Sequence, residues 1–221
     1  MIKLKKLNKP AVLIKNENKW KNRLLQNIAE GKKSTDYLLT RYSDPDIKRK
    51  IVEETSGKCA YCESKLLHIQ HGDIEHIFPK SIDQSKRYEW KNLTLACEIC
   101  NQNKSNNDPN LNYILNPYVD NPEDSLFFIG TMAVSSDAKG FSTEAILSLN
   151  RTNLLEQRKD RLEKITLIFK NITNTNLPLP VRQTIYNDLK NKEASSSNEF
   201  TSMVKCTIEQ LKPRLPNDIV A

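Results

Sequence analysis

Two Cys-x-x-Cys pairs constrain the fold of this 221-residue chain more than any other feature. Each pair can present two thiolates to one ion, and two pairs together supply the four tetrahedral sulfur ligands of a structural zinc site. The 34 residues between the pairs exceed the spacing of about 15–20 residues typical of such zinc sites, so a whole hairpin must be held between them. The four candidate zinc ligands are Cys59, Cys62, Cys97 and Cys100.

Other interpretations of the cysteines are weaker. Four unrelated buried cysteines would not be expected to fall into two matched pairs. A redox role is disfavoured because neither pair lies in an evident βαβ unit. Cys206 stands alone in a helical stretch and is expected to be a small core or surface residue.

Composition indicates a globular chain with one core, or one core and an appendage. Hydrophobic residues make up 38% and charged residues 28% of the sequence, which argues against disorder. No apolar run approaches the roughly 20 residues that span a bilayer. The basic start, MIKLKKLNKP, lacks the apolar stretch of a signal peptide. We therefore expect a cytoplasmic protein.

The positive charge is concentrated near the N-terminus. The chain carries a formal net charge of +7, whereas residues 1–58 alone hold 15 Lys and Arg against 7 Asp and Glu. A basic arm on a nearly neutral body suggests a polyanionic partner such as nucleic acid, because contacts to phosphates release counterions. A lysine-rich solvated surface is the alternative, and charge alone does not separate the two.

The apolar spacing predicts an α+β fold with a helical arm, a small mixed centre and a helical tail. Helices are expected over 17–30, from the Ser43-Asp44-Pro45-Asp46 start to Gly57, from about 150, and over 181–191 and 199–211. Strands are expected at IEHIF, NLTLAC, 126–129, 131–135 and 141–147. The predicted parts are an arm over 1–57, a core over 58–115 and a mostly helical, partner-binding region over 116–221.

Polar residues with metal and acid–base chemistry lie between and just after the cysteine pairs. Glu75 and His76 are adjacent, Asn92 precedes the second pair, and Asn101 follows it. A carboxylate and an amide oxygen are hard ligands that suit Mg²⁺ or Mn²⁺. A neutral histidine can take a proton from water near neutral pH. A metal site that hydrolyses phosphodiesters would use a carboxylate, an amide oxygen and a histidine of this kind.

The order of these residues resembles the HNH nuclease family, whose catalytic element is a ββα-metal fold around one divalent ion. The resemblance implies that His76 is the general base and that Asn92 braces the loop that holds it. It implies that Glu75 and Asn101 bind the catalytic ion. Two positions depart from the commoner family pattern. Glu75 stands where an aspartate is more frequent, and the last motif residue is the asparagine Asn101 rather than histidine, which is a stronger metal ligand.

A narrower resemblance covers about residues 40–170. The segments GKCAYCESKL, IEHIFPKS, YEWKNLTLACEICNQNKSN, LNPYVDNPEDSLFF and ILSLNRTNLLEQR are similar, in this order, to the PtuB-type nucleases of Septu anti-phage systems and of retrons. In that subgroup the nuclease works with an ATPase, PtuA. The resemblance therefore implies a similar ATPase partner, a cytoplasmic defence role, and cleavage that leaves 5′-phosphate and 3′-hydroxyl ends.

The expected activity is metal-dependent cleavage inside nucleic acid, most directly DNA, with zinc as a structural ion. A nuclease acting on RNA would use the same chemistry. A non-catalytic zinc ribbon is the other alternative, but it does not account for the polar set. Further candidates are Lys80 and Lys104 as phosphate contacts, His68 and His71 near the site, and Trp90 as a core anchor or a base-stacking residue.

Overall fold

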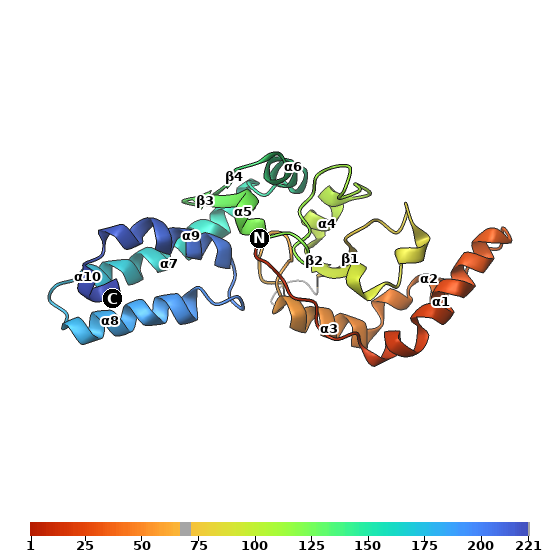
Figure 1. The fold of residues 1–221 in the computed structure, drawn as a ribbon, viewed down its shortest axis with the longest axis horizontal. Helices are drawn as coiled ribbons and strands as arrows, with labels where there is room; N and C mark the ends of the chain where they lie inside the picture. The colour runs from red at the N-terminus through yellow and green to blue at the C-terminus, as the bar shows by residue number, and fades with distance from the viewer. Residues whose placement is uncertain (67–71, 221) are drawn as a thin grey trace.

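The computed structural model describes residues 1–66 and 72–220. Its middle part is a two-stranded antiparallel hairpin followed by a short helix, with helical segments on either side (Figure 1). The elements are α1 (Ala11–Ala29), α2 (Asp36–Leu39), α3 (Pro45–Thr55), β1 (Asp73–His76), β2 (Leu93–Ala96), α4 (Glu98–Lys104), α5 (Pro122–Ser125), β3 (Leu126–Ile129), β4 (Met132–Ser135), α6 (Ala138–Leu147), α7 (Thr152–Thr173), α8 (Leu179–Asp188), α9 (Thr201–Leu211) and α10 (Asn217–Val220).

The strands β1 and β2 pair with Glu75 opposite Thr94 and His76 opposite Leu93. Every residue of β2 is buried, so this strand lies in the core of the central part. Helix α4 begins directly after β2 and contacts β1. The β1–β2–α4 order therefore has the ββα arrangement implied by the resemblance.

Helix α3 begins and ends as its sequence predicts. Asp44 caps the N-terminus by accepting a hydrogen bond from the backbone N–H of Asp46, and Pro45 occupies the first turn. Ile47 and Ile51 are buried on the inner face. The left-handed Ser56, at φ 54°, and Gly57, at φ 68°, then end the helix just before the first cysteine pair.

One predicted strand, over 141–147, is wrong. These residues belong to α6, whose N-terminus is capped by the Asp137 carboxylate, which accepts a bond from the Gly140 backbone N–H at 2.6 Å. A side chain at Gly140 would place its Cβ 2.1 Å from the Ser125 carbonyl oxygen, so the helix packs there because this residue is glycine. Burial at Gly140, Thr143 and Leu147 has helical spacing.

The remaining predicted elements are present, with shifted boundaries. Helix α1 begins six residues before the predicted start at 17, and the short connection after α7 ends at Pro178, the residue before α8. Helix α8 continues into a π-helical turn over Leu189–Glu193. No helix among residues 1–66 and 72–220 is long and apolar enough to cross a membrane.

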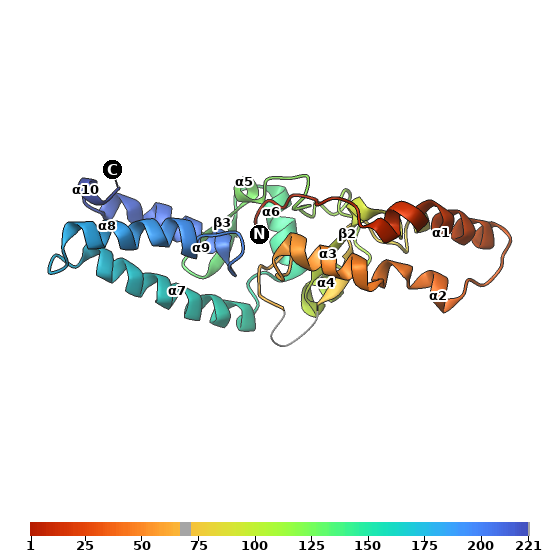
Figure 2. The same ribbon diagram turned by 90° about the horizontal axis from the view of Figure 1, so that it is seen from below.

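Buried apolar side chains form two clusters. The larger one joins the arm, the cysteine pairs, the β1–β2 hairpin and the β3–β4–α6 segment. The smaller one lies within α7–α10. The molecule is correspondingly elongated, with α1 and α2 at one end and the C-terminal helices at the other (Figures 1 and 2). The division into 1–57, 58–115 and 116–221 remains a prediction.

A buried carboxylate, Glu54, fastens the arm to the centre. Its Oε1 accepts from Lys6 Nζ at 2.9 Å and from the Tyr118 hydroxyl at 2.6 Å, and its Oε2 accepts from the Leu7 backbone N–H at 2.8 Å. The side chain is fully buried. Burial and the neighbouring Glu54 charge raise the pKa of Tyr118. One carboxylate thus holds three segments distant in sequence.

We predict that Glu54→Ala lowers the free energy of unfolding by about 3–5 kcal/mol, because the ammonium of Lys6 and the Tyr118 hydroxyl lose their shared partner in a buried site. The matched control is Glu53→Ala, which removes an exposed carboxylate paired with Lys50 and should cost no more than about 0.5 kcal/mol. Urea unfolding of both variants measures the difference, and equal losses would contradict the role assigned to Glu54.

Candidate active site and four-cysteine cluster

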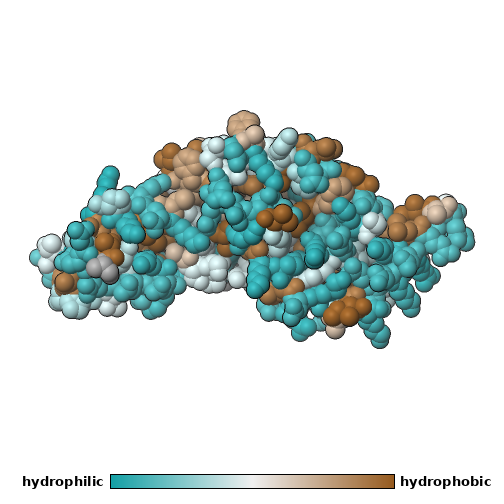
Figure 3. Space-filling view, in the orientation of Figure 1, coloured by the Kyte–Doolittle hydropathy of each residue, from teal (hydrophilic) through white to brown (hydrophobic). Residues whose placement is uncertain are grey.

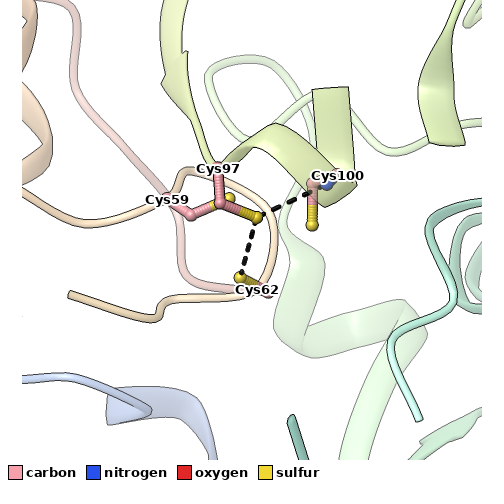
Figure 4. A group of neighbouring side chains, drawn as sticks. All are labelled: Cys59, Cys62, Cys97 and Cys100. Atoms are coloured by element: carbon pink, nitrogen blue, oxygen red, sulfur yellow. Dashed lines mark hydrogen bonds between the residues drawn. The ribbon is translucent and has the colours of Figure 1, made fainter. Parts of the chain in front are cut away.

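The four predicted zinc ligands come together in one buried cluster (Figure 4). Their sulfur atoms all lie within 4.8 Å of one another. Cys59 and Cys62 come from the turn after α3, and Cys97 caps α4 by accepting from the Cys100 backbone N–H at 3.4 Å. Cysteine pairs 34 residues apart are thus brought together as the spacing predicts.

The cluster has dimensions that fit a zinc ion. A tetrahedral site with zinc–sulfur bonds of about 2.3 Å has sulfur–sulfur edges of about 3.8 Å. The Cys62 and Cys97 sulfurs are 3.8 Å apart. Hydrogen bonding among the thiols lowers the pKa of Cys62 and Cys97, whereas burial raises the pKa of Cys59 and the neighbouring thiols raise that of Cys100, so metal binding would release the protons of the last two. Four sulfur donors leave no position for a reactive water.

Sequence reasoning missed Arg151, whose side chain lies against the cluster. Its Nη1 is 3.8 Å from the Cys100 sulfur, and its Nη2 is 3.8 Å from the Cys97 sulfur. Burial opposes the charge of the guanidinium, but the thiolates outweigh it and raise the pKa of Arg151. Arg151 immediately precedes α7, 51 residues after Cys100, so no local spacing indicated this contact.

Helix α4 connects the cysteine cluster to the candidate catalytic residues. Cys97 and Cys100 face the cluster, whereas Asn101 and Lys104, one turn apart, face β1. Residues three apart on a helix share a face. The same seven-residue helix therefore positions two cysteines on one side and two polar side chains on the other.

Asn101 of α4 contacts a residue of β1, and Glu75 of β1 contacts a different residue of α4. Asn101 Nδ2 donates to Asp73 Oδ2 at 3.0 Å, which leaves the amide oxygen of Asn101 available to a cation. Asp73 was missed by sequence reasoning, although it lies two residues before Glu75 and so on the same face of β1. Asp73 and Asn101 are in contact and Glu75 shares the face of β1 on which Asp73 lies, and carboxylate and amide oxygens are the donors that suit Mg²⁺ or Mn²⁺.

Lys104 is not placed for the phosphate contact expected of it. The residue is fully buried, and its Nζ lies 2.9 Å from Glu75 Oε1 and 3.0 Å from the His76 carbonyl oxygen. Burial raises the pKa of Glu75 although Lys104 opposes the change. Glu75 Oε1 therefore already faces one cation, the buried Lys104 ammonium. Lys104 orients this carboxylate.

His76 is held in one tautomer by the connection between β1 and β2. Its Nε2 lies 2.9 Å from the Arg87 carbonyl oxygen, and a carbonyl only accepts, so Nε2 carries the proton. The lone pair of the neutral ring is therefore on Nδ1. Burial, together with the charge of Lys80, lowers the pKa of His76 to about 3. The ring is neutral at physiological pH, as a general base must be.

Asn92 closes the loop behind His76. Its Oδ1 accepts from the Phe78 backbone N–H at 2.7 Å, and its Nδ2 donates to the carbonyl oxygens of Phe78 and Lys86 at 2.9 and 3.2 Å. Both ends of the β1–β2 connection are thus tied through one amide side chain. This is the geometry that bracing the loop requires.

The remaining candidates differ in accessibility. Lys80 is half-buried and its Nζ lies 3.1 Å from the Tyr42 hydroxyl, while the Tyr42 ring packs edge-on against His76 with centroids 4.7 Å apart. Trp90 is buried and donates from its indole N–H to the Leu7 carbonyl oxygen, as a core anchor would. His68 and His71 lie outside the described residues.

We predict that Cys97→Ser lowers the zinc bound per chain and the melting temperature, because one of four sulfur ligands is lost, whereas the serine hydroxyl can still cap α4. Cys206→Ser is the matched control, since Cys206 is free and outside the cluster. Metal analysis of the purified chains and thermal melts compare them. Full zinc content and an unchanged melt for Cys97→Ser would contradict the zinc assignment.

Comparison with known proteins agrees with this geometry. The family model "HNH endonuclease" matches residues 59–107, which span both cysteine pairs, β1, β2 and α4. Septu protein PtuB of Bacillus thuringiensis is 32% identical over 70% of the chain, and Septu protein PtuB of Bacillus mycoides is 26% identical over 61% of it. The matches span 57% of each relative's own length. The chain therefore contains an HNH endonuclease domain over residues 59–107 and is similar to Septu protein PtuB.

Proposed function

We propose that this protein is a metal-dependent endonuclease that hydrolyses phosphodiester bonds in nucleic acid, with DNA as the first candidate substrate. The hydrogen bond from His76 Nε2 to the Arg87 carbonyl carries the proposal. It places the lone pair of a neutral, buried imidazole on Nδ1, which is the state that can accept a proton from an attacking water. A zinc ribbon that only binds nucleic acid would have no use for this arrangement.

Each polar residue has a role in the proposed reaction. His76 Nδ1 takes the proton of the water that attacks phosphorus. Glu75 and Asn101, with Asp73 beside them, would hold the catalytic Mg²⁺ or Mn²⁺, and the ion would supply positive charge for the phosphate and the departing 3′ oxygen. Asn92 keeps His76 in place by bracing the loop. The products would carry 5′-phosphate and 3′-hydroxyl ends.

Zinc on the four cysteines is proposed to be structural. The four thiolates close its coordination, and Arg151 offsets part of their negative charge. Because α4 carries both cysteines and Asn101, loss of zinc would displace a ligand of the catalytic ion. The two metals would therefore have separate roles on one helix.

We predict that His76→Gln lowers the rate of nucleic acid cleavage by about 10²–10⁴-fold. Glutamine can still donate an N–H to the Arg87 carbonyl and fills a similar volume, but it has no basic nitrogen. Unchanged zinc content and melting temperature would show that the fold is intact. Assays with Mg²⁺ or Mn²⁺ on duplex DNA and on structured RNA would identify the substrate. Cleavage by His76→Gln at the wild-type rate would exclude the assigned base.

We also propose that the chain is the effector subunit of an anti-phage system of the Septu or retron type and acts with a PtuA-like ATPase in the cytoplasm. The similarity to Septu protein PtuB supports this proposal. Residues 116–221 are the proposed partner-binding region, since they extend beyond the residues matched by the HNH model.

The expected result is that the ATPase encoded beside this gene co-elutes with the chain on size-exclusion chromatography, and that a chain truncated before α8 does not co-elute. Cleavage assays with and without ATP would then test control by the partner. A neighbouring gene of another class, together with full activity of the isolated chain, would contradict the partnership.

A further inference from the structure

A basic hollow opens between α1 and the segment from α2 to the start of α3. It encloses about 380 Å³. Lys19 and Arg23, one turn apart on α1, line one side, and Arg41 lines the other. Trp20 of the same helix is buried at its base. Three cations thus converge on one small concave surface at the arm end of the molecule, which is mostly hydrophilic in Figure 3.

In the described part of the chain, the three cations of the basic hollow are not neutralised by a carboxylate, although Arg41 Nε donates to the Tyr37 carbonyl oxygen at 3.0 Å. Within residues 1–66 and 72–220, none of them takes part in an ion pair. Like charges one turn apart on a helix, as at Lys19 and Arg23, destabilise it slightly. Asp44 is the one acidic side chain that lines the hollow, and its carboxylate caps α3.

Aromatic and cationic groups alternate from the hollow toward the catalytic histidine. The Arg41 guanidinium stacks 3.8 Å from the centroid of the Tyr37 ring, which is 65% exposed. Tyr42, the next residue, packs against the His76 ring. Lys80 lies 4.5 Å from the centroid of the Tyr42 ring. Arg41, which lines the hollow, is thus the neighbour in sequence of Tyr42, which contacts both His76 and Lys80.

Hydrogen bonds hold the arm in this position beside the β1–β2 connection. Arg87 Nη1 donates to the Leu39 carbonyl oxygen at 2.8 Å, and the Tyr88 hydroxyl donates to the Leu38 carbonyl oxygen at 2.6 Å. The Trp20 and Tyr88 rings pack with centroids 5.8 Å apart. Arg87 also supplies the carbonyl that orients His76. The arm is thus fixed to the loop that sets the catalytic base.

We propose that the basic hollow, formed by Lys19, Arg23 and Arg41, binds the phosphodiester backbone of the substrate and directs the strand past Tyr42 and Lys80 to His76. This inference rests on the proposed nuclease function and names the surface that captures its substrate. Unpaired cations beside a hydrolytic site recognise phosphates without reading sequence. The exposed Tyr37, already stacked on an arginine, offers a face to an adjacent base.

The test measures binding in a His76→Gln background, so that the probe is not cleaved. The arm variant combines Lys19→Gln, Arg23→Gln and Arg41→Gln. The control variant combines Lys159→Gln, Lys164→Gln and Lys170→Gln, which removes three exposed lysines from α7 at the opposite end of the molecule (Figure 1). Fluorescence anisotropy follows binding of a short duplex DNA and of an RNA hairpin at several salt concentrations.

The arm variant should bind one of the probes about one to two orders of magnitude more weakly than the background, and its salt slope should fall by about three, roughly one per lost phosphate contact. The control variant should keep both values. Equal effects in the two variants, or no effect of the arm variant on either probe, would overturn the proposal. If His76→Gln abolishes cleavage but the arm variant binds both probes as tightly as the background, the proposed nuclease function stands and only the role of the basic hollow in substrate binding is rejected.

Discussion

The contact of the four cysteine sulfurs is the constraint on which the central part of the structure depends. It joins the turn after α3 to the first turn of α4 and so closes the β1–β2 hairpin between them. Because α4 has only seven residues, its rotation is set by Cys97 and Cys100. That rotation decides where Asn101 and Lys104 point. A structural ion at the cysteines would therefore control a reaction it takes no part in.

Around the candidate active site, charged groups are buried and paired inside the protein. Lys104 neutralises Glu75, and Arg151 lies against the sulfurs of Cys97 and Cys100. A buried charge without a partner would cost several kcal/mol. Internal pairing lets these side chains keep their positions without a bound substrate. The cations proposed to bind phosphates, in contrast, line a hollow at the surface of the arm.

Much of the local structure follows from residue chemistry alone. Asp44 and Pro45 mark the start of α3, and the apolar runs around Glu75 and Leu93 mark the two paired strands. The strand predicted over 141–147 was wrong: the Asp137 cap is a local helix signal that precedes the apolar run, whereas the close packing of Gly140 on Ser125 depends on a separate segment of the chain. Short apolar runs are ambiguous between strand and helix until their packing partner is known.

The sequence by itself determined the chemical inventory: two matched cysteine pairs, an adjacent acid and histidine, and the asparagines that follow in family order. Covalent spacing is enough for this, since it limits which residues can share an ion. Only the tertiary structure decided that Lys104 is buried against Glu75, that Asp73 contacts Asn101, and that Arg151 contacts the cysteine cluster. These contacts depend on side-chain direction and on segments up to 54 residues apart, which no local pattern encodes.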